Sequence, residues 1–152
     1  MASQEVSAVA AVTLLCYNWS VEKEGWLASR RLAQAFWVQA RADHATCVSL
    51  LDAGIYYASV FFSQQAAEKA LKAAGLDILH RNLRGHHLIQ MANALDAPIE
   101  VMNAAAELNA EFLTSRNPDA SDGVPAQLYD QESAWIHLRA AETILEWVKS
   151  FL

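Results

Sequence analysis

Apolar residues recur at three- and four-residue intervals along most of the chain, which is the period of an amphipathic helix. The segment 30–51 contains no glycine or proline, and its pattern predicts one long helix that Gly54 ends in a left-handed cap. A second helix is predicted over residues 55–74, where it meets Gly75. Each would be about 30 Å long. The short turn between them therefore predicts an antiparallel hairpin.

Three further helices are expected in the second half of the chain. After a connection over residues 75–85, a short helix is predicted at 86–95. The next begins with Asp96 as its N-cap and a proline in its first turn, and it reaches about Thr114. Residues 116–125 combine Pro, Gly, Asn, Asp and Ser, which predicts a loop. The last helix runs from about residue 128 to 152, with an apolar face wider than one neighbour needs.

These elements define the expected fold class and domain. No segment alternates between apolar and polar residues as a strand does, so the prediction is all-α, an up-and-down bundle of about five helices. A length of 152 residues fits one domain. The regular pattern begins near Arg30, which predicts a helical domain over residues 30–152 behind an N-terminal extension, residues 1–29, that is partly helical or flexible.

The extension contains an apolar run at residues 6–17. This run is too short to span a bilayer, and no Lys or Arg precedes it as in a signal peptide. We interpret it as a short helix or an extension packed on the bundle, with a mistaken start at Met1 as the alternative. The expected location is cytoplasmic, without a membrane. Cys16 and Cys47 lack metal-ligand spacing, so buried reduced thiols and no metal site are expected.

The charge is uneven along the chain. A net charge of −6 excludes a protein coated with nucleic-acid-binding charge. Basic side chains gather between Lys69 and His87, whereas acidic ones dominate from Asp96 to Glu132. The pattern fits either ordinary variation among solvated faces or a local anion site around the second helix and its exit loop.

A polar stripe stands out on the second helix. Gln65, Glu68, Lys69 and Lys72 share one helical face, and Gln64 lies beside them. Glu68 and Lys72 have the spacing of a favourable ion pair. The stripe is either a solvated helix face or a surface partly buried against another helix or chain.

Several motifs stand in a recognisable order along residues 33–152. They are Trp37, Gln39, Ala40, Arg41 and Asp43; Gln64, Gln65, Glu68, Lys69 and Lys72; His86, His87 and Leu88; Arg116, Asn117, Pro118 and Asp119; Tyr129; and Ile144, Leu145, Trp147 and Val148. In these motifs the chain resembles the HEPN family of small helical domains.

The resemblance implies a homodimer that partners a separately encoded minimal nucleotidyltransferase, as in toxin–antitoxin pairs. The expected function is a non-catalytic nucleotide-binding or interaction module, with a nucleotide such as ATP as the possible ligand and no cofactor. Lys and Arg would hold phosphate, while Gln or Asn would contact the base or ribose. The predicted nucleotide- or partner-binding residues are Gln65, Glu68, Lys69, Lys72, Arg116, Asn117 and Asp119.

The first alternative is a metal-independent ribonuclease toxin, because many HEPN proteins cut RNA with an Arg-x(4–6)-His motif. Histidine moves protons near neutral pH, and arginine stabilises charge on phosphate. Here Ser121 stands where the late motif after Arg116 needs histidine, which favours a protein that is not an enzyme. Arg81 and His86 fit the letters of the motif at an earlier position and are minor catalytic candidates. Nucleic acid is an expected partner only under this alternative.

The second alternative is a purely structural dimer without a ligand. The wide apolar face of the last helix and an exposed Trp135 would fit such a role. The resemblance to toxin–antitoxin pairs also raises Tyr129 as a residue that the partner modifies.

Overall fold

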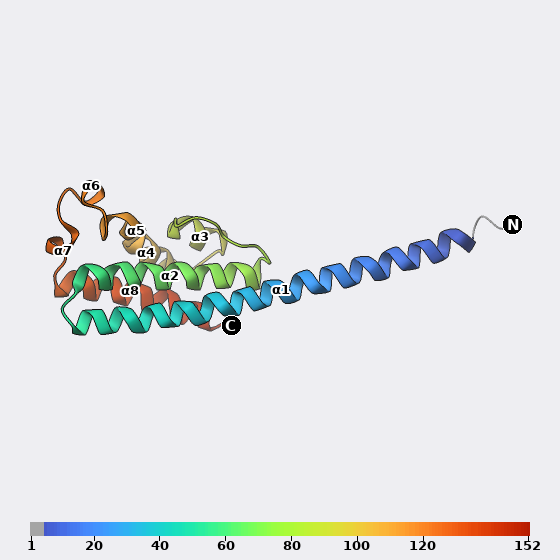
Figure 1. The fold of residues 1–152 in the computed structure, drawn as a ribbon, viewed down its shortest axis with the longest axis horizontal. Coiled ribbons are helices and arrows are strands. Elements are labelled where there is room, and N and C mark those ends of the chain that lie inside the picture. Colours follow the sequence, from blue (N-terminus) through green and yellow to red (C-terminus); the bar gives the residue numbers. More distant parts are fainter. Residues whose placement is uncertain (1–4) are drawn as a thin grey trace.

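The computed structural model describes the backbone from residue 5 to 152 and the side chains from residue 22. All regular structure in this range is helical, which confirms the predicted all-α class (Figure 1). The helices are α1 (Glu5–Asp52), α2 (Tyr56–Ile78), α3 (Leu88–Ala94), α4 (Ile99–Leu108), α5 (Glu111–Thr114), α6 (Pro118–Ser121), α7 (Pro125–Leu128) and α8 (Gln131–Lys149).

The three long helices α1, α2 and α8 run alongside one another, and the short helices α3 to α7 lie on one side of them (Figure 1). Helix α2 is central, because it packs against both α1 and α8. Its buried face is rich in alanine, with Ala66, Ala67, Ala70 and Ala74 fully covered. Such small side chains let the neighbouring helix backbones approach closely. A second, smaller cluster around Cys47 and Leu138 fills the end of the bundle near the α1–α2 turn.

The α1–α2 turn confirms the predicted hairpin and cap. Gly54 has φ +74°, a left-handed conformation that costs glycine little. The Ile55 N–H donates to the Leu50 carbonyl at 2.9 Å. The glycine thus closes α1 and reverses the chain into α2.

Gly75 does not end α2 as predicted, since the helix continues to Ile78. A Cβ atom at Gly75 would lie 2.7 Å from Leu83 Cγ and 3.2 Å from the Arg81 carbonyl oxygen. The glycine therefore lets the returning chain lie directly against the helix. Leu79 is the C-cap of α2, and the chain turns away from the helix at His80, whose φ is 50°.

The bounds of the following helices also differ from the prediction. Helix α3 begins after His87, whose Nδ1 accepts from the Gln90 N–H at 3.4 Å. Asp96 is not an N-cap: its φ is 50° and its N–H donates to the Asn93 carbonyl, so it reverses the chain after α3. Pro98 caps α4 with its extended backbone instead. The helix predicted to reach Thr114 is split into α4 and α5.

Buried Cys47 matches the expectation of a buried thiol. Its Sγ lies 3.0 Å from Ser63 Oγ and 3.3 Å from Ser59 Oγ, and burial raises its pKa. The side chain of Cys16 lies outside the described residues.

Helix α1 passes without a break through residue 30, the expected domain boundary. Its N-terminal part projects beyond the ends of the other helices, and the apolar run 6–17 is part of this projecting helix (Figure 1). No helix in the described part of the chain is both long and apolar enough to cross a membrane.

Candidate functional site

A connected row of polar side chains, here called the polar ladder, follows α2 and ties it to α1 and to the loop before α3. It consists of Gln39 and Asp43 of α1, Gln64, Gln65, Glu68, Lys69 and Lys72 of α2, and His86 of the loop. Because α2 is the central helix, this row lies largely beneath its neighbours, which answers the open question whether the stripe is solvated or covered.

At one end, Lys69 joins α2 to α1. Its Nζ donates to Asp43 Oδ2 at 2.6 Å and to Gln65 Oε1 at 2.9 Å. The other carboxylate oxygen of Asp43 accepts from Gln39 Nε2 at 2.8 Å. Both oxygens of this buried carboxylate are therefore satisfied, as buried charges require.

The two adjacent glutamines form the middle of the ladder. Gln65 Nε2 donates to Gln64 Oε1 at 2.7 Å, and Gln64 Nε2 donates to Glu68 Oε2 at 3.1 Å. Each amide uses its oxygen and its nitrogen, so the pair links two ion pairs that would otherwise be separate.

At the other end, Glu68 contacts a lysine and a histidine side chain. Lys72 Nζ lies 2.7 Å from Oε1, which confirms the predicted ion pair, and His86 Nδ1 lies 2.9 Å from Oε2. Burial alone raises the pKa of Glu68, but hydrogen bonds from Lys72, His86 and Gln64 outweigh it and hold the pKa below its ordinary value of 4.5. The carboxylate is therefore ionised at neutral pH.

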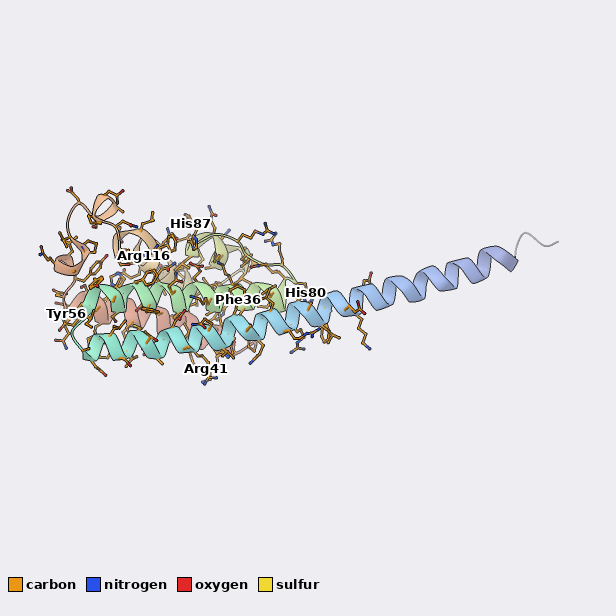
Figure 2. All side chains as sticks on the ribbon, viewed as in Figure 1. Phe36, Arg41, Tyr56, His80, His87 and Arg116 are labelled. Atoms are coloured by element: carbon orange, nitrogen blue, oxygen red, sulfur yellow. The ribbon has the colours of Figure 1, made fainter. Side chains whose placement is uncertain are left out.

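His86 connects the ladder to an aromatic stack at the surface. Its ring lies parallel to that of Phe112, with centroids 3.7 Å apart and an angle of 9°. The Arg116 guanidinium lies 4.5 Å from the Phe112 ring and 4.6 Å from the Phe61 ring, the geometry of cation–π contacts. Arg116 lies on the side of the bundle formed by the short helices, whereas Arg41 lies on the opposite side (Figure 2).

The predicted binding residues thus fall into two groups. Gln65, Glu68, Lys69 and Lys72 form one continuous network in which both ammonium groups already donate to carboxylates, with the lysine side chains 22% and 13% exposed. Arg116 is exposed, and the only hydrogen bond of its side chain within the described residues runs from Nε to the Phe112 carbonyl.

The remaining loop residues are placed differently. Asn117 donates to the Leu113 carbonyl at 3.2 Å, and Asp119 is exposed on α6. Ser121 Oγ lies 3.0 Å and 3.1 Å from the carbonyl oxygens of Asn117 and Gly123. The Ser121 hydroxyl is therefore hydrogen-bonded to the backbone of the loop. Arg81 is exposed, and no hydrogen bond or ion pair joins it to His86 in the described structure.

No motif in the sequence pointed to a second, partly buried polar cluster around Glu111. The Tyr129 hydroxyl and Thr114 Oγ1 donate to Glu111 Oε2, and His137 Nε2 lies 3.3 Å from Glu111 Oε1. Burial, and then the hydrogen bond to Glu111, raise the pKa of Tyr129 to about 12. The Tyr129 hydroxyl is thus held as a neutral donor to Glu111.

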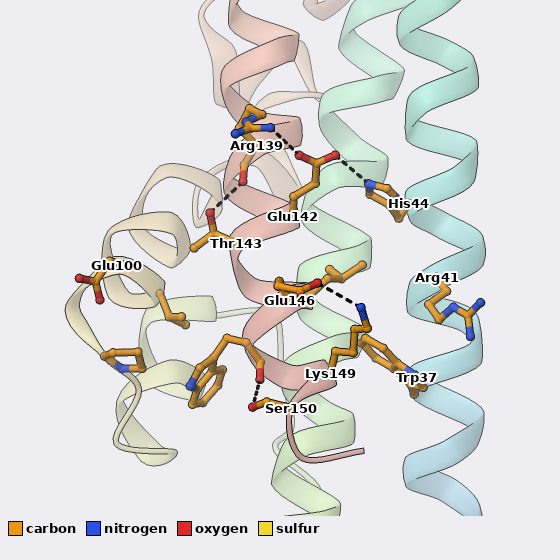
Figure 3. Close-up of a pocket in the computed structure, with 14 residues that line it drawn as sticks. Trp37, Arg41, His44, Glu100, Arg139, Glu142, Thr143, Glu146, Lys149 and Ser150 are labelled. Atoms are coloured by element: carbon orange, nitrogen blue, oxygen red, sulfur yellow. Dashed lines mark hydrogen bonds and ion pairs between the residues drawn. The ribbon is translucent and has the colours of Figure 1, made fainter.

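An open groove lies on another side of the bundle, between α1, α8 and the start of α4. Its volume is about 1160 Å³. Trp37 and Arg41 of α1 face Glu146 and Lys149 of α8 across it (Figure 3). Glu142 on α8 lies 3.4 Å from His44, and Arg41 makes no ion pair in the described residues.

No group of three His, Cys, Asp or Glu side chains suited to a metal ion occurs among the described residues. The arrangement therefore offers three features: a ladder whose charges are compensated internally, an exposed arginine and histidine on one phenyl ring, and an open groove lined by tryptophan and charged side chains.

Comparison with known proteins gives a consistent picture. The family model described as HEPN domain matches residues 33–151. The crystal structure of TT1696 from Thermus thermophilus is 31% identical, covers 79% of this chain and 98% of its own, and superposes with a TM-score of 0.74. ST0689, an archaeal HEPN homologue, is 29% identical over 78% of this chain and 95% of its own, with a TM-score of 0.68. No curated protein matches.

Proposed function

This chain belongs to the HEPN domain family, and from that premise we propose that it is a non-catalytic nucleotide-binding or interaction module, a homodimer that partners a minimal nucleotidyltransferase. The main support for this proposal comes from the loop after α5. Arg116 is followed there by Ser121, whose hydroxyl is bound to the loop backbone. A serine in that position supplies no proton shuttle at neutral pH.

Arg116, the exposed cation of this loop, is the side chain best placed to bind a phosphate group. Ladder residues Lys69 and Lys72 are compensated by Asp43 and Glu68, so an added anion would have to compete with buried carboxylates. Arg116 is held in place by two phenyl rings and directs its terminal nitrogens to no carboxylate in the described structure. In the proposed site Arg116 holds phosphate, Asn117 and Asp119 lie beside it, and Gln65, Glu68, Lys69 and Lys72 fix the helix beneath.

Calorimetric titration with ATP tests this site. We expect binding to the wild-type protein and a roughly ten- to hundredfold weaker affinity for Arg116→Ala, because a hydrogen bond to a charged group contributes about 1.5–3 kcal/mol. Arg139→Ala is the matched control, since Arg139 is also exposed but lies at the groove and pairs with Glu142; its affinity should stay within about twofold of wild type. Equal losses in both variants would contradict the assignment.

One observation favours a second function, the metal-independent ribonuclease. His86 and Arg116 contact the same Phe112 ring, and Glu68 engages His86 Nδ1, so Nε2 is left for a substrate. A carboxylate that orients a histidine is a recurring arrangement in general acid–base catalysis. This hypothesis replaces Arg81 by Arg116 as the partner of His86, and it predicts RNA cleavage that His86→Ala abolishes.

A further inference from the structure

Helix α1 carries a row of alternating cations and aromatic rings, here called the cation–aromatic stripe. Its members fall within about 60° of one another around the helix axis at 100° per residue. They are Lys23, Trp26, Arg30, Trp37, Arg41 and His44. The stripe extends from the projecting part of α1 into the groove, where Trp37, Arg41 and His44 form the α1 wall.

The N-terminal half of this stripe has few partners within the chain, apart from the ion pair of Arg30 Nε with Asp77 Oδ1 at 4.0 Å. The hydrogen bond from Ser29 Oγ to the Leu76 carbonyl, at 3.1 Å, marks where α1 meets the end of α2. Before it, Trp26 is 44% and Leu27 40% exposed, and the Arg30 guanidinium lies 5.2 Å from the Trp26 ring. Large apolar side chains gathered on one projecting helix mark an interaction surface.

The stripe is complementary to itself when it is reversed. In one antiparallel register, Trp26 of one helix lies opposite Arg41 of a second copy, and Arg30 lies opposite Trp37. Each aromatic ring then meets a cation, an attraction of about 0.5–2 kcal/mol per contact. Two-fold symmetry produces every contact twice, and the axis passes beside the exposed side chain of Gln34.

We propose that two copies of this chain pair through antiparallel α1 helices, so that the projecting part of each lies in the groove between α1 and α8 of the other. Trp37 and Arg41 in the open groove receive Arg30 and Trp26 of the second copy. Exposed Leu27 and Val38, which border the stripe, are covered in the same contact. This inference rests on the homodimer of the proposed function and names the surface that forms it.

Crosslinking through one introduced surface cysteine tests the register. In the full-length chain with Cys16→Ser, which keeps only the buried thiol of Cys47, Gln34→Cys should give a covalent dimer with a short bismaleimide, since the two symmetry-related residues lie beside the axis. Ala45→Cys is the matched control, because Ala45 is exposed near the same face of α1 but about 33 Å from its symmetry mate at 1.5 Å per residue. It should give no crosslink.

Sedimentation without crosslinking tests separately whether the chain forms a dimer and whether α1 forms the dimer surface. Trp26→Ala should weaken dimerisation at least about tenfold because both symmetry-related contacts are lost, whereas Trp135→Ala, at another exposed tryptophan, should leave it unchanged. A dimer that resists Trp26→Ala and shows no crosslink at residue 34 overturns this surface but leaves the homodimer. A wild-type monomer overturns both, and an α1 surface that binds only a different protein would give that result.

Discussion

Replacing Glu68 with alanine is expected to lower the free energy of unfolding by about 3–5 kcal/mol, the usual cost of removing one partner from a buried ion pair. Glu68 is 4% exposed and joins Lys72, His86 and Gln64 in one place. Its loss leaves a lysine that is 13% exposed without a counter-charge. Chemical denaturation followed by circular dichroism measures the change.

Two variants make this result specific to the ladder. Glu68→Gln keeps the shape but removes the charge, so it should cost less than alanine. Glu146→Ala removes a carboxylate whose pair with Lys149 is at the surface, with side chains 77% and 67% exposed, and it should cost no more than about 0.5 kcal/mol. If Glu68→Ala cost as little as Glu146→Ala, the ladder would be a solvated helix face.

Acid should unfold the protein cooperatively below about pH 4.5. The pKa values of Glu68 and Glu111 both lie below their ordinary value of 4.5, although burial opposes this, because each accepts hydrogen bonds from a histidine and other donors. A depressed pKa means that the ionised carboxylate stabilises the fold above pH 4.5, and that this stabilisation is lost as the pH falls through the folded-state value.

At rising pH, the Glu111 cluster is expected to lose stability through its histidine, His137. Burial lowers the pKa of His137, but hydrogen bonds to Glu111 and the Ser133 carbonyl outweigh it and raise the pKa above 6.5. Its stabilisation is therefore complete below pH 6.5 and is lost as the pH rises through the raised value. Unfolding free energies measured from pH 3 to 9 should decline on both sides of a maximum. Glu111→Gln should flatten both declines. Glu107→Gln, at a side chain that is 48% exposed and lies 3.8 Å from His137 Nε2, should weaken only the alkaline decline, and by less.

The sequence was most informative where contacts are local. The Glu68–Lys72 pair and the Gly54 cap depend on residues within one or two helical turns, and both predictions are confirmed. Gly75 shows the limit. A glycine in a helical pattern signals either a stop or a close approach of another segment, and only the position of Leu83 decides between them.

The contacts that form the candidate site join residues far apart in the sequence, so residue spacing could not predict them. Lys69 meets a carboxylate 26 residues away and Glu68 a histidine 18 residues away, so the stripe alone could not show that its lysines are compensated. Phe112 lay in no motif, yet it joins His86 to Arg116. The paired glutamines were the one local sign that the stripe is covered, because amides in a row of ions are suited to linking buried charges.

Cleavage of a labelled RNA by the purified protein in EDTA tests the central claim, that this HEPN chain is non-catalytic, most directly. The proposed function predicts no cleavage by the wild-type protein, and none by His86→Ala or Arg116→Ala. Cleavage by the wild type that both substitutions abolish, while a surface variant such as Arg139→Ala retains it, would contradict the claim. It would establish His86 and Arg116 as residues of a ribonuclease site.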